Sequence, residues 1–356
     1  MAGDATSSVM RAGDVGRAAR RDLQFRIPRK PVVRLGLRAR PEETGWIIDG
    51  ARKSQVLGGA FAREHMGPLL QACDGTRTLD EIGEVTGVGP QAAFEAVSLL
   101  WTGGIVEEGD TEPAPGDPAP ELARLLSRLG DSTGVNDSWQ DAARRLAAAR
   151  VAVVGDAELA GEMVAALEPT LPEVRLDSAP RRGDTLTVLV ETADSAARSQ
   201  EVARRCWEEG IPLLRVRAEQ EAVTVGPYVD ETFSPCLACA CADEPEIGPR
   251  PEATRHDIIV GLAARAVAAL IARATVTHLP GDARRTDLAT FTYTDRPVVS
   301  RPGCPVCSVA GAGVEPVPVA PSAPVGARYE QSVAIPPAAF VASTGHQQHY
   351  QPSNLS

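Results

Sequence analysis

Four cysteines arranged as two CxxC pairs constrain this chain more than any other feature. The pairs are Cys236-Leu237-Ala238-Cys239 and Cys304-Pro305-Val306-Cys307, and a long insert separates them. A two-residue spacer lets both sulfurs of a pair reach one tetrahedral ion, so the four thiolates predict a Zn²⁺ site. If thiolates fill all four positions, the ion is structural and keeps no open site for a substrate.

Two other interpretations of these cysteines are two disulfides or four unrelated core thiols. Zinc is favoured because paired CxxC spacing is typical of metal knuckles and because a cytosolic protein rarely keeps disulfides. Cys241 is close enough in the sequence to compete as a ligand, whereas Cys73 and Cys206 fall in helical patterns and are expected in the core.

Charge and hydropathy argue against several classes of partner. The chain has 356 residues and a formal net charge of −11, which disfavours general nucleic-acid binding and a surface that seeks anionic lipid. Arg265 and Arg273 interrupt the longest apolar run, residues 258–274, so no membrane span is expected. The N-terminal residues lack the apolar core of a signal peptide, and we expect a cytoplasmic protein.

Shifts in composition predict five segments. They are a disordered, arginine-rich arm over residues 1–29, a small domain over 30–110, a proline-rich linker over 111–120, an α/β domain over 121–310 and a flexible tail over 311–356. The prolines make the linker stiff and exposed. The tail is rich in Pro, Ala, Val, Gln and Ser, a composition that does not bury a core of its own.

The small domain is predicted to be a winged helix. Asp49-Gly50 signals a hairpin, and Thr78 with Glu81 forms a capping box at the start of the second helix. Strands followed by three short helices and a returning wing strand are typical of this fold. The expected strands cover residues 31–37, 46–48, 52–57 and 105–106, and the expected helices begin at 61, 79 and 90.

A winged helix usually suggests DNA binding, but the charges here argue against it. The third helix, residues 91–101, contains no Lys or Arg and carries Glu95. From Pro31 to Asp110 there are twelve carboxylates and seven cations, whereas a helix that reads a groove needs cations for phosphate contacts. Nucleic acid is therefore not an expected partner, and a DNA-binding regulator is the weakest of three functional hypotheses.

The small domain resembles the PqqD-like recognition element of enzymes that modify ribosomally made peptides. The resemblance is most specific from Asp74 to Ile82, Asp-Gly-Thr-Arg-Thr-Leu-Asp-Glu-Ile. In that family the leader of a precursor peptide adds as a strand beside the third strand and lies against the third helix, a form of β-augmentation. The resemblance implies peptide-binding residues Arg52, Lys53, Ser54, Gln55, Val56 and Leu57 on the strand edge, and Ala92, Glu95 and Leu99 on the helix.

Arg52 and Lys53 would suit an acidic leader, although solvated hairpin charges explain them equally well.

Alternating strands and helices over residues 121–310 predict a doubly wound, Rossmann-like α/β domain. The turn after its first strand, residues 155–160, lacks the second and third glycines of a nucleotide-binding loop. Asp156 and Glu158 put negative charge where a triphosphate would lie, so no ATP binding is expected. Asp177 ends the second strand, where a ribose contact would be expected, but this signal is weak by itself.

This α/β domain resembles the adenylating fold of the ubiquitin-activating and ThiF/MoeB type. The likeness rests on residues 151–155, 186–191 and 225–227 and on the two CxxC pairs. Active members carry an intact glycine loop, an Asn/Arg/Gln stretch after the second strand and a catalytic cysteine before the second zinc knuckle. Here that stretch is Asp177-Ser178-Ala179-Pro180-Arg181-Arg182 and the cysteine is missing. The resemblance therefore implies a zinc-bearing scaffold without the ATP chemistry, and no catalytic residue is assigned.

Together the two domains resemble the Ocin-ThiF-like proteins of thiazole/oxazole-modified microcin (TOMM) and thiopeptide pathways. The resemblance implies a non-catalytic subunit that binds the leader of a precursor peptide and presents it to a separate YcaO-type cyclodehydratase, which uses ATP to form azolines. The alternative hypothesis is a working ATP-dependent adenylating enzyme of the ThiF/MoeB type. Because relatives of the adenylating fold often pair, a homodimer is a further expectation.

Overall fold

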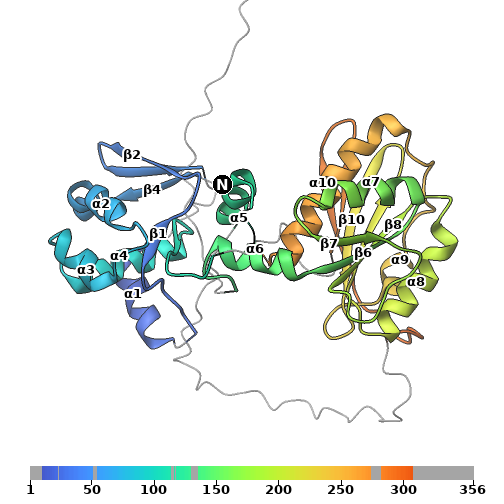
Figure 1. Ribbon diagram of the computed structural model, residues 1–356, viewed down its shortest axis with the longest axis horizontal. Helices are drawn as coiled ribbons and strands as arrows, with labels where there is room; N and C mark the ends of the chain where they lie inside the picture. Colours follow the sequence, from blue (N-terminus) through green and yellow to red (C-terminus); the bar gives the residue numbers. More distant parts are fainter. Residues whose placement is uncertain are drawn as a thin grey trace, which may run out of the picture. The chain divides into compact units, whose positions relative to one another are not determined.

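The structure, a computed structural model, describes residues 10–307 apart from 23, 51–53, 114, 115, 117, 130–134 and 274–281. The chain divides into two units whose boundary lies between Asp110 and Thr111 (Figure 1). The tail predicted over residues 311–356 lies outside the described residues. Among the described helices, none combines the length and the apolar character that crossing a bilayer requires.

The described residues of the N-terminal unit form two small antiparallel sheets and four helices. Its core gathers Ile48, Leu69, Ile82, Leu100 and Trp101, all of which are almost fully buried. The elements are α1 (Ala12–Arg21), β1 (Pro31–Val33), β2 (Arg38–Glu42), β3 (Gly45–Asp49), β4 (Gln55–Gly58), α2 (Ala60–Ala72), α3 (Leu79–Val85), α4 (Pro90–Thr102) and β5 (Val106–Glu108).

The three helices predicted for this unit are present as α2, α3 and α4. The capping box at α3 is confirmed, because Thr78 Oγ1 accepts a hydrogen bond from the Glu81 backbone N–H at 3.4 Å and the Glu81 carboxylate accepts one from the Thr78 backbone N–H at 2.8 Å. This reciprocal pair satisfies two donors that the first turn leaves without helical partners. The winged-helix assignment itself stays a prediction.

The strands differ from the expectation in two places. Only Pro31–Val33 of the run 31–37 is a strand, and it pairs with β5 rather than with the sheet β2–β3–β4, because a turn with Gly36 at φ +84° follows it. The hairpin predicted at Asp49-Gly50 is present, because β3 and β4 pair antiparallel, although β4 begins only at Gln55 and the connection is longer than two residues. A second hairpin, which was not predicted, joins β2 to β3 through Glu43-Thr44. The sequence Arg-Ala-Arg-Pro-Glu of β2 is exposed throughout and lacks the apolar alternation that would have identified it.

The arm expected to be disordered over residues 1–29 contains helix α1. Val15, Gly16 and Ala19 form its buried face, while Asp14 near its start and Arg20 and Arg21 at its end suit the helix dipole. The helix packs on α4. An arginine-rich segment can therefore be ordered when small residues on one face let it approach a neighbouring helix closely.

The C-terminal unit is built on a seven-stranded mixed sheet, as expected for an α/β domain. The strand order is β12-β11-β10-β9-β8-β6-β7; β7, β6, β8 and β9 are parallel, and β10, β11 and β12 are antiparallel. The elements are α5 (Pro120–Leu129), α6 (Trp139–Ala148), β6 (Arg150–Gly155), α7 (Ala157–Leu167), β7 (Glu173–Leu176), β8 (Leu186–Glu191), α8 (Ala196–Glu208), β9 (Leu213–Ala218), β10 (Ala222–Val229), α9 (Leu237–Cys241), a 3₁₀ turn (Ala253–Arg255), α10 (His256–Ile271), β11 (Asp282–Asp287) and β12 (Tyr293–Pro297).

Helices cover both faces of this sheet (Figure 1). Val151 and Val153 of β6 pack in one core with α7 and α10, and Ala152 and Val154 pack in a second core with α8 and α9. This alternation along a strand that is apolar on both faces is what a covered parallel sheet requires. The carboxyl ends of β6, β8 and β9 therefore meet at one edge, where a nucleotide would bind in an active adenylating fold.

Candidate functional site

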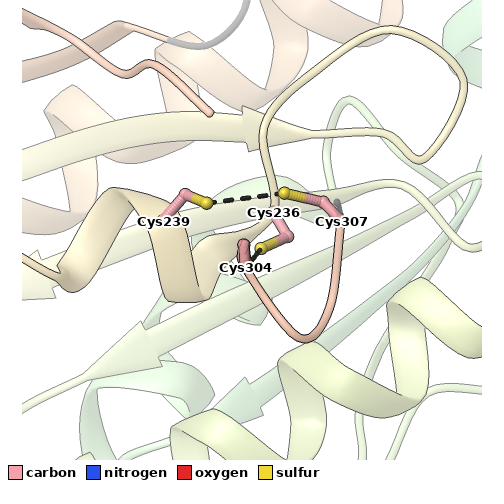
Figure 2. Close-up of side chains that lie close together, drawn as sticks. All are labelled: Cys236, Cys239, Cys304 and Cys307. Carbon is pink, nitrogen blue, oxygen red and sulfur yellow. Dashed lines mark hydrogen bonds between the residues drawn. The ribbon is translucent and has the colours of Figure 1, made fainter. Parts of the chain in front are cut away.

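Four cysteine side chains converge in the C-terminal unit, as the two CxxC pairs predict (Figure 2). Cys236 is the N-cap residue of α9 and Cys239 lies within this helix, while Cys304 and Cys307 belong to the turn after β12. The Sγ atoms of Cys236 and Cys304 are 3.6 Å apart, and those of Cys239 and Cys307 are 3.4 Å apart. All four sulfur atoms lie within 4.8 Å of one another.

These distances fit a tetrahedral zinc ion. Zn–S bonds of about 2.3 Å in a regular tetrahedron hold the sulfur atoms about 3.8 Å apart, close to both spacings. All seven cysteines of the chain are free thiols, so the disulfide interpretation is wrong. Cys241 is not part of the cluster. Cys73 and Cys206 are buried core thiols, and burial raises their pKa values to about 12 and about 11.

Backbone hydrogen bonds around the cluster favour the thiolate form of the cysteines, whereas burial opposes it. The backbone N–H groups of Cys307 and Val306 lower the pKa of Cys304 to about 6, and the Arg301 backbone N–H donates to Cys239 Sγ at 3.3 Å. Burial raises the pKa values of Cys236 and Cys239, so a nearby cation would be needed to keep these thiols ionised. A zinc ion would supply that charge and would join the turn 301–307 to α9.

The turn after β6 keeps the backbone of a nucleotide-binding loop at its first position. Gly155 has φ +131°, and a Cβ atom there would lie 1.9 Å from the Val190 carbonyl oxygen, so only glycine fits beside β8. The next residue, Asp156, caps α7, and its carboxylate accepts a hydrogen bond from the Leu159 backbone N–H at 3.2 Å. A bound phosphate would compete with this carboxylate for the same end of the helix.

Arg250, in the segment before α10, forms ion pairs with the acidic side chains of this turn. Its guanidinium donates to both carboxylate oxygens of Asp156 at 3.0 and 3.1 Å and to Glu158 at 2.7 Å. The Thr192 hydroxyl also donates to Asp156, at 3.1 Å. The Arg250 hydrogen bonds are the main cause that lowers the pKa of Asp156 to about 2, so this carboxylate stays charged at neutral pH.

The segment that carries Arg250 is held in place by buried ion pairs. Glu244 accepts hydrogen bonds from Arg215 at 2.5 Å and from Arg217 at 3.1 Å, and all three side chains are buried. The Gly248 backbone N–H donates to Glu219 at 2.9 Å. Removing one partner of a buried pair is costly, so this segment is fixed over the carboxyl ends of the strands.

The sequence pattern predicted the two carboxylates of this turn but not Arg250, which binds them. Its setting between Pro249 and Pro251 indicates an extended segment but not the loop that it reaches. Asp177, the weak ribose signal, forms ion pairs with Arg175 at 3.1 Å and Arg181 at 2.7 Å. Its carboxylate is therefore held by arginines from its own neighbourhood.

β4 is the exposed edge of the three-stranded sheet in the N-terminal unit. It pairs with β3 on one side, and no described strand pairs with its other side. Val56 is 53% exposed whereas Leu57 is buried, as alternation along a strand requires. The opposite edge strand, β2, contains Pro41, which has no backbone N–H to donate. β4 is therefore the edge better suited to accept another strand.

The structure places the remaining predicted peptide-binding residues as follows. Gln55 Nε2 donates to the Gly103 carbonyl oxygen at 2.7 Å and so joins β4 to the end of α4, and Ser54 Oγ donates to Asp49 at 2.6 Å. Ala92 and Leu99 are half-buried on α4. Arg52 and Lys53 lie outside the described residues.

Glu95, the third helix residue predicted to contact a peptide, lies against α1. A Cβ atom added to Gly16 would lie 2.7 Å from Glu95 Cγ and 3.3 Å from Glu95 Cα, so the two helices touch at this point. The Arg20 guanidinium lies 4.6 Å from the centre of the Phe94 ring and donates to Gln91, which donates to Glu95. α1 thus covers part of the α4 surface that includes Glu95.

Replacing Gly16 by alanine is expected to loosen α1 from α4. The added Cβ cannot fit without moving Glu95, and overpacking of this kind costs about 1–3 kcal/mol. Gly13→Ala is the matched control, because a Cβ there meets its nearest atom at an ordinary 3.5 Å and both changes raise helix propensity alike. Amide hydrogen exchange of residues 12–21 measures the effect; equal protection in both variants would contradict the packing described here.

Comparison with known proteins gives a fold and no family. No family model matches the sequence, and no curated protein matches it. Among solved structures, a heterocyclase in complex with substrate and cofactor matches with a TM-score of 0.57 and 16% identity, over 78% of this chain and 39% of that one. The heterocyclase TruD matches with a TM-score of 0.56 and 17% identity, over 79% of this chain and 43% of its own.

E. coli MccB matches with a TM-score of 0.62 and 12% identity, over 78% of this chain and 96% of MccB. Other matching structures hold MccB with ATP and with MccA. This chain thus spans less than half of the two heterocyclase chains and nearly all of MccB. Neither unit alone makes up 78% of the chain, so the shared fold extends over both units. At these identities the likeness shows the fold alone.

Proposed function

We propose that this protein is a non-catalytic subunit that binds the leader of a ribosomally made precursor peptide and delivers it to a separate YcaO-type cyclodehydratase for azoline formation, in a thiopeptide or other TOMM pathway. One observation carries the proposal: the same chain combines an open strand edge with an adenylating-type fold whose nucleotide turn is filled by its own side chains. The fold likeness to heterocyclases and to MccB, which has been solved with MccA, supports a role in peptide modification.

The leader binds as a fourth strand beside β4 in this proposal. Main-chain hydrogen bonds along residues 54–57 provide affinity, and contacts with alternate side chains provide selectivity. Val56, more than half exposed, is positioned to meet one of these side chains, and Ala92 and Leu99 of α4 supply an apolar flank. Arg52 and Lys53 add positive charge for an acidic leader.

The side-chain contacts in the turn after β6 are the reason for proposing a non-catalytic role. A triphosphate would have to displace the Asp156 carboxylate from the amino end of α7 and remove Arg250 from two carboxylates. It would then lie beside Asp156 and Glu158, whose charges repel it. The zinc ion in this proposal stabilises the C-terminal unit and takes no part in a reaction.

The alternative is an active adenylating enzyme, and the observation that favours it is the likeness to MccB, which has been solved with ATP. Two measurements on the full chain separate the hypotheses. We expect fluorescence anisotropy to show binding of the leader of a precursor encoded beside the gene, and calorimetry to show no heat of binding for Mg–ATP. Precursor-dependent exchange of pyrophosphate into ATP would establish the alternative. Failure to bind any such leader would overturn the peptide-binding role.

A further inference from the structure

The connection between β7 and β8 leaves part of the large sheet without a covering helix. Residues 177–185 join the two strands as a loop, although β6 lies between them in the sheet. Arg150 and Ala152 of β6 point to the same face, since side chains alternate along a strand, and Ala152 belongs to the core under α8 and α9. Arg175 is the register partner of Ala152 on β7. Arginines therefore gather on this face, where a crossover helix would otherwise pack.

A cleft of about 320 Å³ opens at this place. It lies at the amino ends of β6 and β7, away from the turn after β6, and carries charged groups of both signs. Four arginines and two carboxylates line most of it: Arg150, Arg175, Arg181, Arg182, Glu173 and Asp184.

Two of the four arginines already form ion pairs with carboxylates of the same chain. Arg175 donates to both oxygens of the buried Asp184 at 2.7 and 2.8 Å and to Asp177 at 3.1 Å. Arg181 pairs with Asp177 at 2.7 Å, and its backbone N–H donates to Asp184 at 2.8 Å. These contacts hold the loop 177–185 against β7.

The other two arginines are available to a ligand. Neither Arg150 nor Arg182 has a carboxylate of the described chain within 4.0 Å of its guanidinium. The Arg150 guanidinium lies against Gly183, where a Cβ atom would be 3.1 Å from its Nη2 atom, so the loop limits its movement. Two guanidinium groups thus line one cleft in a chain whose net charge is −11.

We propose that this cleft binds an acidic segment of another polypeptide through paired carboxylate–guanidinium contacts. An arginine fork matches the two oxygens of a carboxylate, and fixed neighbours reduce the entropy lost on binding. A polypeptide is favoured over a nucleotide because none of the residues lining the cleft offers an aromatic ring for a base. β7 is also the last strand of the sheet, so its outer backbone groups can guide an extended segment past the cleft. This site is independent of the β4 edge and of the proposed function.

The test uses fluorescein-labelled hexaglutamate and the full chain, with anisotropy recorded at low ionic strength. The double variant Arg150→Gln/Arg182→Gln is expected to weaken binding about tenfold or more. The matched control is Arg124→Gln/Arg128→Gln, which removes the same charge from two exposed arginines of α5 in the same unit; we expect it to change affinity less than about twofold.

Three results would overturn the proposal. The first is an absence of binding by the unaltered chain, and the second is an equal loss of affinity in both double variants, which would mean attraction by overall charge. The third is displacement of the peptide by inorganic phosphate at an ionic strength where sodium chloride has no effect, which would assign the cleft to a phosphate ligand instead.

Discussion

Replacing Cys236 or Cys304 by serine is expected to abolish stoichiometric zinc binding and to unfold much of the C-terminal unit. A structural zinc ion contributes on the order of 10 kcal/mol of folding free energy in small zinc domains, which is comparable with the ~5–15 kcal/mol that stabilises a typical protein. A variant that cannot bind the ion would hold the turn 301–307 to α9 only through weak contacts such as the hydrogen bond from the Arg301 backbone N–H to Cys239 Sγ.

Cys241→Ser is the matched control, because Cys241 lies on the same helix, two residues after a ligand, but outside the cluster. Metal content by mass spectrometry and thermal unfolding by calorimetry measure the two effects. For the control we expect one zinc per chain and an unchanged melting temperature. For the ligand variants we expect no bound zinc and a much lower melting temperature. A ligand variant that contains no metal and yet melts with the unaltered protein would show that the cysteines are ordinary core residues.

Local signals in the sequence predicted those parts of the structure that depend on neighbouring residues. The capping box at Thr78 and Glu81, the start of α4 at Pro90 and the apolar strands β6 and β8 follow from interactions within one element or from burial on both faces. The CxxC pairs belong to the same group, since each hook carries its own two ligands. Only the convergence of the two pairs on one site depends on the tertiary structure.

The features that the sequence did not predict depend on distant partners. α1 is ordered because Gly16 lets it approach Glu95, about eighty residues further along the chain. Arg250 fills the nucleotide turn only because buried ion pairs of Glu244 fix the segment between α9 and α10. Periodicity reports which face of an element is buried, but it does not report which element covers that face.

The contact of α1 with Glu95 leaves less of α4 free for the proposed peptide site. Ala92 and Leu99 lie on the same face of α4 as Glu95 and are half-buried, whereas the β4 edge has no described strand beside it. Binding should then depend on the backbone of β4 more than on any single side chain.

Replacing Val56 by proline is expected to weaken leader binding by about 30- to 150-fold. A proline in an edge strand removes a backbone donor and disturbs the neighbouring pairing, and the loss of two main-chain hydrogen bonds amounts to about 2–3 kcal/mol. The control is Val85→Thr, a change at another exposed valine of the same unit that leaves the strand edge intact. Proline is not used at this position because it would break α3. Anisotropy with the labelled leader measures both variants, and circular dichroism verifies that they fold.

The same prediction can be tested without altering the protein, by N-methylating one backbone amide of the leader at a time. In a strand that adds to β4, successive N–H groups point alternately toward and away from the edge, so only every second methylation should weaken binding. A leader bound as a helix against α4 would instead tolerate methylation poorly at all interior positions, because each N–H there donates to its own helix. An alternating pattern would establish strand addition, and a uniform loss would place the leader on α4 and rule out the β4 edge as its main contact.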